Sequence, residues 1–458
     1  MTDNSTICAI STPLGHSGIG IVRLSGPDAV PIAEKFFKAS NGKPPSEQPA
    51  HQLIHGHVID GDRVVDEVLM SVMRAPHSYT TEDVVEVNCH GGIVAVRKTL
   101  ELMLRGGARL AEPGEFTKRA FLGGRIDLAQ AEAVADLISA QTAAALSAAA
   151  NQLQGKLSGR ITGMREKLTD CLAHVEASID FPEDEVPELP GTNMLEIVRG
   201  IIKDINDLLE NARGGKLYRE GVSTVIVGKP NVGKSSILNA ILSEPRAIVT
   251  AEPGTTRDVI VESIDLHGIA LRLCDTAGIR EPGCEVERLG VERSERAIEE
   301  ADLALFVADL AEPLSSEDMR IIARLTGKPH VVVAANKADL RPDADLSEIA
   351  KKLPGRKIVC TSATQGTGIK ELEETIFGEI TDGTTIAPQE ILVSRLRHRQ
   401  ALERAQAALT TASDAWRMSP EFVAVDLREA LDCLGEIVGA VYTDDLLDRI
   451  FSEFCIGK

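Results

Sequence analysis

The stretch Gly228-Lys229-Pro230-Asn231-Val232-Gly233-Lys234-Ser235 follows the apolar run Thr224–Val227 and precedes a helical pattern. This spacing is that of a phosphate-binding loop, in which backbone N–H groups and a helix N-terminus face the phosphates of a nucleotide. Far downstream stands Asn336-Lys337-Ala338-Asp339. The Asp339 carboxylate can accept two hydrogen bonds from the ring N–H and amine of guanine, which adenine cannot match. The motifs therefore predict a chain that binds GTP rather than ATP.

The remaining nucleotide roles fall on residues between and after these motifs. Lys234 should reach the β- and γ-phosphates, and Ser235 and Thr256 should ligate Mg²⁺. Asp275-Thr276-Ala277-Gly278 ends a predicted strand, where it would lie near the metal and the γ-phosphate. The predicted GTP-binding residues are Asn231, Val232, Gly233, Lys234, Ser235, Ser236, Thr250, Ala251, Glu252, Pro253, Gly254, Thr255, Thr256, Asp275, Thr276, Ala277, Gly278, Asn336, Lys337, Ala338, Asp339, Ser362, Ala363 and Thr364.

Short apolar runs alternate with amphipathic stretches from residue 221 to about 380. The runs are Thr224–Val227, Leu271–Cys274, Leu303–Val307, Val331–Ala335 and Ile358–Cys360. Continuous apolar strands between helices indicate a doubly wound, mostly parallel sheet that is covered on both faces. This pattern predicts a Ras-like P-loop GTPase domain in the middle of the chain.

The predicted secondary structure of the segment before the GTPase region changes along its length. Up to about residue 120 it reads as mixed α/β, with β-rich runs at 19–24, 64–73 and 84–87. A helix should follow Gly92, with Val94, Leu100 and Leu104 buried.

Helical texture begins near Asp127, and apolar residues then step by three or four from Leu153 to Ile179. A further helix is expected over Met194–Ala212, with Gly214-Gly215 as a hinge. Past Thr385 helical texture returns, and Thr443 can cap a last helix.

The predicted domains are 1–120, 121–215, 216–382 and 383–458. The first is α/β, the third is the GTPase domain, and the second and fourth form one discontinuous helical domain.

Composition limits the partners and the compartment of the chain. Its 458 residues carry 69 acidic and 49 basic side chains, for a formal charge of −20. Such a chain repels polyanions on average, so any RNA contact needs a local basic patch or a partner's surface. The eight cysteines form no CxxC pair, and no apolar stretch approaches about 20 residues. We expect a cytoplasmic protein without a zinc site or a membrane span.

Ile279 follows the Asp275–Gly278 motif, at a position where many GTPases have a glutamine that orients water. Isoleucine cannot orient water, so hydrolysis must be slow or assisted by another group. Arg257 and Arg280 are candidate arginine fingers, and pairing with neighbouring acids is an equal alternative. Glu285 and Glu287 could position water from a distance, although each also suits a solvated acidic stretch.

The outer segments carry motifs that ordinary small GTPases lack, and through them the chain resembles the MnmE (TrmE) family of tRNA uridine-modifying GTPases from end to end. The resemblance rests on Gly15–Gly26, Ser78–Asp83, Pro113–Thr117, Arg119–Leu122, Asp127–Ala133 and the terminal Phe454-Cys455-Ile456-Gly457-Lys458.

The resemblance implies GTP hydrolysis coupled to tRNA modification. With a partner, MnmG, which uses FAD and NADH, the family adds an aminomethyl or carboxymethylaminomethyl group to carbon 5 of the wobble uridine. A 5-formyl- or 5,10-methylene-tetrahydrofolate on the N-terminal domain is associated with the one-carbon unit. A homodimer forms through that domain and joins MnmG in a heterotetramer, and we expect MnmG to carry most of the tRNA surface.

The resemblance also assigns residues. Asn231, Thr250, Glu252 and Thr255 match the positions that hold K⁺ in place of an arginine finger. Glu287 matches the water-positioning acid, and the GTPase domains meet face to face in the transition state. The implied folate-binding residues are Arg23, Glu82, Arg125 and Lys458.

The folate-binding hypothesis also has support from the chemistry of the pterin ring. The pyrimidine half of a pterin shows the same N–H and amine edge as guanine, so Glu82 could read it as Asp339 reads the base. Cys455 is either an exposed thiol on a frayed tail or a nucleophile at the folate site, with Lys458 lowering its pKa.

Two questions stay open from the sequence. The basic stretch Arg395, Arg397, His398, Arg399 and Arg404 could touch tRNA, but a solvated helix face is the favoured interpretation. A regulatory GTPase of the ribosome-assembly type, with accessory domains that only dock, is the alternative function.

Overall fold

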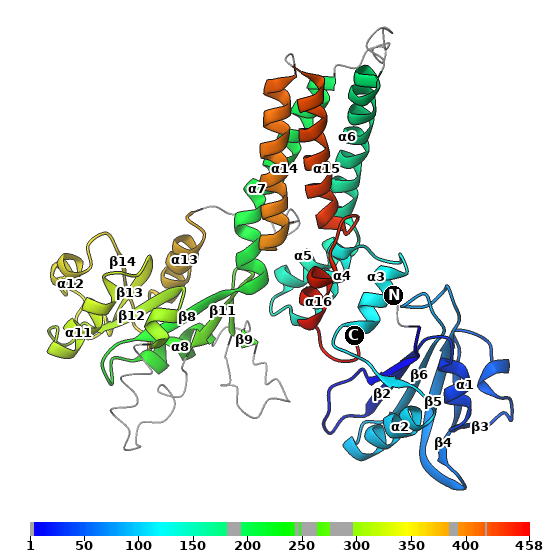
Figure 1. The fold of residues 1–458 in the computed structure, drawn as a ribbon. Coiled ribbons are helices and arrows are strands. Elements are labelled where there is room, and N and C mark those ends of the chain that lie inside the picture. The colour runs from blue at the N-terminus through cyan, green and yellow to red at the C-terminus, as the bar shows by residue number, and fades with distance from the viewer. Residues whose placement is uncertain are drawn as a thin grey trace.

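The computed structural model describes residues 4–180, 194–242, 247–248, 263–274, 296–383, 393–416 and 419–458. The described chain forms an upright helical bundle above two α/β lobes, one from the N-terminal segment and one from the middle of the sequence (Figure 1). The C-terminus returns to the N-terminal lobe, here called the head.

The head is built on one seven-stranded sheet in the order β3-β4-β5-β6-β2-β1-β7. Neighbouring strands are antiparallel except the β1–β7 pair. Its elements are β1 (Ile7–Ile10), β2 (Ile19–Ser25), α1 (Ala29–Glu34), β3 (Phe37–Ala39), η1 (Pro45–Glu47), β4 (Leu53–Asp60), β5 (Arg63–Met73), β6 (Val84–His90), α2 (Ile93–Arg105) and β7 (Arg109–Leu110). Apolar side chains of α1 and α2 share one core with the sheet, so both helices cover the same face.

The predicted strands in the head are present as β2, β5 and β6, and the helix after Gly92 is α2. Of the three predicted buried positions of α2, Leu100 packs against the core, but the other two are wrong. Val94 is 82% exposed and Leu104 is 36% exposed, whereas Val96 and Leu102 are buried. Both helix faces carry apolar residues, and the position of the sheet decides which face is covered.

The helical domain joins two distant parts of the chain. The first part contains α3 (Glu115–Leu122), α4 (Leu128–Ser139), α5 (Ala143–Leu153), α6 (Lys156–Asp180) and α7 (Met194–Glu220), and the second contains α14 (Leu396–Ala415), α15 (Pro420–Val438) and α16 (Asp444–Ser452). Figure 1 shows α6, α7, α14 and α15 side by side, and their apolar faces share one core. Thr443 caps α16, as predicted. The discontinuous helical domain is thus confirmed.

Helix α7 does not end at the predicted hinge but runs through Gly214-Gly215 to Glu220. Position 215 requires glycine because the chain that returns from the middle lobe passes close to α7 there. A Cβ built on Gly215 would lie 2.0 Å from the carbonyl oxygen of Val393. Glycine here permits a close backbone crossing inside a helix, at a cost of about 1 kcal/mol in helix propensity.

The middle lobe is the predicted doubly wound domain. Its sheet has the order β14-β13-β12-β8-β11-β10-β9, parallel from β14 to β11, with antiparallel β10 and β9 at one edge. Its elements are β8 (Val222–Val227), α8 (Lys234–Leu242), β9 (Ala247–Ile248), β10 (Ser263–Leu266), β11 (Ile269–Cys274), β12 (Leu303–Asp309), α11 (Ser316–Leu325), β13 (His330–Asn336), α12 (Ser347–Lys352), β14 (Lys357–Cys360) and α13 (Ile369–Ile380). Separate cores on the two sheet faces hold α8 with α13 and α11 with α12.

The hairpin between β10 and β11 gives this lobe a second attachment to the helical domain. The Thr142 hydroxyl, which caps α5, donates a hydrogen bond to the carbonyl oxygen of Gly268 at 2.7 Å. Gly268 has φ +91°, and a Cβ there would lie 2.7 Å from the Ala144 side chain. The hairpin that separates residues 249–262 from residues 275–295 therefore rests on the start of α5.

The solvated helix face that we favoured for this basic stretch of α14 is correct for the exposed Arg399 and Arg404 but wrong for its first part. Arg397 and His398 both bond the buried Glu132 of α4, at 2.9 and 2.7 Å, and Arg395 bonds Asp136 at 2.6 Å. Burial would raise the pKa of Glu132, but the hydrogen bond from the His398 ring and the charges of Arg397 and Arg395 outweigh it and hold that pKa below its ordinary range. These five side chains, here called the junction cluster, join α4 to α14.

Burial of Arg395 and His398 removes both from any RNA surface. Arg399 and Arg404, farther along α14, pair with Glu403 and Glu436.

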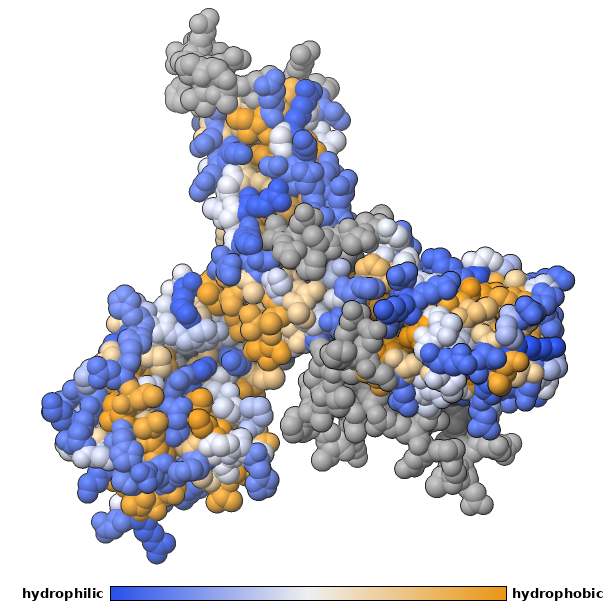
Figure 2. Space-filling view, turned by 180° about the vertical axis from the view of Figure 1, so that it is seen from behind, coloured by the Kyte–Doolittle hydropathy of each residue, from blue (hydrophilic) through white to orange (hydrophobic). Residues whose placement is uncertain are grey.

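Figure 2 shows the same lobes from behind, with hydrophilic side chains over much of the visible surface and apolar patches between them. Among the described residues, no helix has both the length and the apolar character needed to span a bilayer.

Candidate functional site

The glycine-rich loop lies between β8 and α8, with Lys234 as the first residue of the helix. Asn231 has φ 64° and Gly233 has φ +94°, left-handed conformations that turn the loop back on itself. The Lys234 ammonium donates to the carbonyl oxygens of Gly228 and Lys229, at 2.7 and 2.9 Å. Burial lowers its pKa. To reach a phosphate, Lys234 must exchange these carbonyl partners for phosphate oxygens.

Asn336 ties three loops together at the carboxyl edge of the sheet. Its side-chain amide donates to the carbonyl oxygen of Val232 at 2.8 Å, and its side-chain oxygen accepts from the backbone N–H of Ala363 at 3.2 Å. A Cβ at Gly233 would lie 2.3 Å from the Asn336 amide nitrogen. The asparagine of the downstream motif therefore packs directly on the phosphate loop, and only glycine at position 233 leaves it room.

The rest of the downstream motif faces the same edge. Lys337 pairs with Asp309 at the end of β12, at 2.6 Å, and the Ala338 N–H donates to the carbonyl oxygen of Thr361 at 3.0 Å. Within the described ranges, the Asp339 carboxylate has no hydrogen-bond or ion-pair partner. A half-buried carboxylate with free acceptors suits the two donors of guanine.

Ser362, Ala363 and Thr364 follow β14, beside the Asn336 motif. The Ser362 and Thr364 hydroxyls lie 3.2 Å apart, and the Ser362 N–H donates to the carbonyl oxygen of Thr367. The structure thus brings the end of β14 to the predicted base-binding motif.

The other predicted nucleotide and cation residues lie outside the described residues. They are Thr250, Ala251, Glu252, Pro253, Gly254, Thr255, Thr256, Arg257, Asp275, Thr276, Ala277, Gly278, Ile279, Arg280, Glu285 and Glu287. Of the predicted cation ligands, Asn231 and Ser235 are described, one in the loop and one in the first turn of α8.

A second cluster of predicted residues surrounds the C-terminal tail, which lies against the head. The carbonyl oxygen of Gly457 accepts from the Ser11 hydroxyl at 3.0 Å and from Arg23 at 3.3 Å. Ile456 forms a β-bridge with Pro113, and the Gly114 N–H donates to the Cys455 carbonyl oxygen at 3.4 Å. The tail therefore brings the exposed Cys455 to the region of Arg23, and Lys458 lies three residues farther along the chain.

Tyr79 links the two predicted arginines. The guanidinium carbons of Arg23 and Arg125 lie 5.9 and 4.9 Å from the centre of its ring, and Arg125 also donates to its carbonyl oxygen at 3.1 Å. Arg23 lies 5.6 Å from the Phe116 ring and pairs with Glu86 at 2.7 Å. Phe116 is buried, so Tyr79 and the two guanidinium groups, one of them paired with Glu86, are what this region can offer to a flat, anionic molecule.

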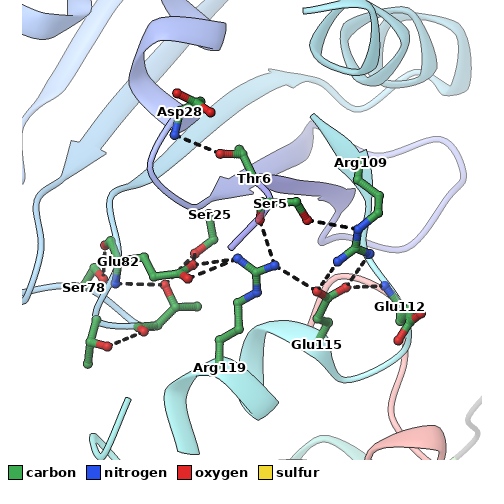
Figure 3. A network of polar contacts seen from close by, with 12 residues as sticks. Ser5, Thr6, Ser25, Asp28, Ser78, Glu82, Arg109, Glu112, Glu115 and Arg119 are labelled. Carbon is green, nitrogen blue, oxygen red and sulfur yellow. Dashed lines mark hydrogen bonds and ion pairs between the residues drawn. The ribbon is translucent and has the colours of Figure 1, made fainter. Parts of the chain in front are cut away.

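Glu82 lies within a larger polar network (Figure 3). Its Oε2 accepts from Arg119 at 3.0 Å and from the Ser25 hydroxyl at 2.6 Å, and its Oε1 accepts from Arg119 at 3.1 Å. A carboxylate oxygen accepts about two hydrogen bonds, so one position on Oε1 remains. That leaves room for one further bond, rather than the two that the guanine-like interpretation needs.

Sequence reasoning missed Tyr79, Phe116 and Arg119 as parts of this region. All three stand inside motifs that mark the family resemblance, so the motifs carried the signal. Their roles depend on contacts between distant segments, which a single sequence does not show.

Comparisons with known proteins cover the whole chain. The family model for the GTP-binding protein TrmE N-terminus matches residues 6–125, and the model for the MnmE helical domain matches residues 128–455. The chain is 48% identical to the tRNA modification GTPase MnmE of Bacillus subtilis, over 99% of this chain and 100% of the relative. It is 49% identical to the same-named protein of Geobacillus thermodenitrificans, over 100% of both.

Among solved structures, the chain is similar to the G domain of T. maritima FeoB, with 27% identity and a TM-score of 0.27. The match covers 34% of this chain and 98% of the FeoB chain.

Proposed function

Because this chain belongs to the MnmE family of tRNA modification GTPases, we propose that it hydrolyses GTP to modify carbon 5 of the wobble uridine in tRNA. The group added is aminomethyl or carboxymethylaminomethyl. The observation that supports the GTPase half is the hydrogen bond from Asn336 to Val232, which holds the Asn336–Asp339 motif and the phosphate loop together at one edge of the sheet. The described residues that we predict to bind GTP lie at or just after the carboxyl ends of β8, β13 and β14.

The cations of the proposal are Mg²⁺, held by Ser235 and Thr256, and K⁺, held by Asn231, Thr250, Glu252 and Thr255. Amide, hydroxyl and carbonyl oxygens are the donors that such hard cations prefer. The exposed Asn231, held at φ 64° in the loop, supports its part of the K⁺ site. Each ion would supply positive charge for the transferred phosphoryl group, and Glu287 would position water.

The folate part of the proposal places a tetrahydrofolate, as the 5-formyl or 5,10-methylene form, on the head. Arg23, Arg125 and Lys458 would bind its anionic groups and Glu82 its pterin. The arginines around Tyr79 and the docked tail support this site, because they concentrate positive charge beside an aromatic ring. The carrier would supply the one-carbon unit, and Cys455 lies on the tail as its candidate nucleophile.

The partners in this proposal are a second copy of the chain, bound through the head, and MnmG with its FAD and NADH. In this proposal MnmG provides most of the surface that binds tRNA, and the protein is located in the cytoplasm. The division into 1–120, 121–215, 216–382 and 383–458 stays a prediction.

Two measurements on purified protein test the proposal. GTP hydrolysis should rise when Na⁺ is replaced by K⁺, and ATP should not be hydrolysed; equal rates in both salts remove the Asn231 assignment. In a wobble-uridine modification assay with MnmG, Cys455→Ser should lose product while keeping GTP hydrolysis. Full modification by Cys455→Ser would show that the thiol is not a nucleophile.

A further inference from the structure

Arg119 occupies the centre of the polar network in Figure 3. Its side chain, only 9% exposed, projects from α3 into the space between β1 and the loop that precedes β6. One guanidinium nitrogen donates to both oxygens of Glu82. The other donates to the carbonyl oxygen of Ser5 at 2.9 Å and to Glu115 at 3.0 Å. The planar guanidinium fork is therefore fixed from two sides.

Glu115 holds Arg119 from behind. Its carboxylate accepts from Arg109 at 2.7 Å and from the backbone N–H of Glu112 at 2.9 Å. Burial would raise the pKa of Glu115, but Arg109, the Glu112 N–H and Arg119 outweigh it and lower that pKa. Glu115 therefore stays charged at neutral pH and keeps the Arg119 guanidinium in place.

The opposite side of Glu82 is fixed by hydroxyl groups. Ser25 donates to Oε2, and it lies 2.6 Å from the Thr80 hydroxyl, which is itself buried. The Ser78 hydroxyl donates to the Glu82 carbonyl oxygen. The Glu82 side chain nevertheless remains 27% exposed. A carboxylate held from both sides, with one acceptor position still open to solvent, is typical of a preorganised binding group.

We propose that Arg119 is a positioning residue, which fixes the Glu82 carboxylate so that Oε1 can accept one hydrogen bond from the N–H edge of a pterin. The inference rests on the folate site proposed above and adds to it the residue that orients the acid. It also changes the expected contact between Glu82 and the pterin from two hydrogen bonds to a single charge-assisted hydrogen bond.

Helix α3 makes this role consequential, because the same helix contacts the tail. Gly114, which precedes α3, bonds the Cys455 carbonyl oxygen, and Lys118 pairs with Asp448 of α16 at 2.7 Å. One short helix thus sets both the acid that binds the carrier and the segment that holds the thiol.

A double-mutant cycle on the full-length protein tests the proposal, with 5-formyltetrahydrofolate as the calorimetric probe. Glu82→Gln and Arg119→Gln should each weaken binding by roughly tenfold or more, the effect of one charge-assisted bond. If Arg119 acts only through Glu82, the double variant should bind no worse than Glu82→Gln alone. Arg119→Lys, which keeps the charge but loses the fork, should restore part of the affinity.

Arg74→Gln is the matched control, because Arg74 pairs with Asp83, the neighbour of Glu82 in the same loop, at 2.9 Å. It should bind the probe as wild type does.

Additive losses in the double variant, or an equal loss in Arg74→Gln, would show that Arg119 merely stabilises the head and would overturn the inference alone. A wild-type protein that does not bind the probe would overturn the folate site and this inference with it.

Discussion

Replacing Gly457 with alanine should release the C-terminal tail from the head. Gly457 has φ +95°, and a Cβ there would lie 2.3 Å from the carbonyl oxygen of Ile10. Because the colliding atom belongs to the backbone, no change of side-chain rotamer relieves the contact.

The magnitudes favour release. A left-handed conformation costs an alanine about 1–2 kcal/mol before any collision is counted. The hydrogen bonds from Ser11 and Arg23 to the Gly457 carbonyl oxygen each contribute roughly 0.5–3 kcal/mol. Strain and attachment are therefore of similar size, and we expect the undocked population to rise by at least about tenfold, which is about 1.4 kcal/mol.

Hydrogen exchange of the peptide that covers residues 453–458 measures this population, and exchange should accelerate in Gly457→Ala. Gly42→Ala is the control, because Gly42 has φ +76° but no atom lies within 4 Å of its Cβ position. Modification of wobble uridine should fall in Gly457→Ala while GTP hydrolysis persists. Tail exchange at the wild-type rate in Gly457→Ala would refute the docking described here.

Three further predictions concern other parts of the molecule. Thr142→Ala should destabilise the chain by about 1–2 kcal/mol through loss of the α5 cap and the bond to the β10–β11 hairpin, whereas Thr142→Ser should not; urea unfolding with equal midpoints for the two variants contradicts this. Burial lowers the pKa of His398, so below pH ~6.5 the imidazole takes up a proton in the unfolded state but not in the folded state. The free energy of unfolding should therefore decrease as the pH drops below ~6.5, by up to about 1.4 kcal/mol per pH unit. Thermal unfolding of His398→Gln should lack that contribution, and identical pH slopes would argue against it. Asp339→Asn should lower GTP affinity by roughly 100-fold in nucleotide competition, because both charge-assisted bonds to guanine are lost; unchanged GTP affinity would place the base elsewhere.

The fold follows from the sequence where local pattern decides it. The five predicted strands of the middle lobe are present, because each is a continuous apolar run between helices. The phosphate loop and the Asn336 motif also met as expected, because carboxyl ends of parallel strands lie at one edge.

Contacts between distant segments were the part that pattern could not supply. The junction cluster pairs Arg395 with Asp136, which lies 259 positions earlier, so the first part of a basic stretch that looks solvated is instead an internal ion cluster. The tail contact between Arg23 and Gly457 spans 434 positions. Similarly, the prediction of a hinge at Gly215 was wrong. A glycine is needed there because the backbone of Val393, which belongs to a segment beyond the middle lobe, crosses α7 at that point.

The central claim is that guanine-nucleotide hydrolysis in the middle lobe serves tRNA modification. Nucleoside analysis of tRNA from a strain that lacks this gene, complemented with the wild-type chain or with Lys234→Ala, tests it most directly. We predict that the carbon 5 group of wobble uridine disappears in the deletion strain, returns with the wild-type chain and stays absent with Lys234→Ala. A normal carbon 5 group in tRNA of the deletion strain would contradict the claim.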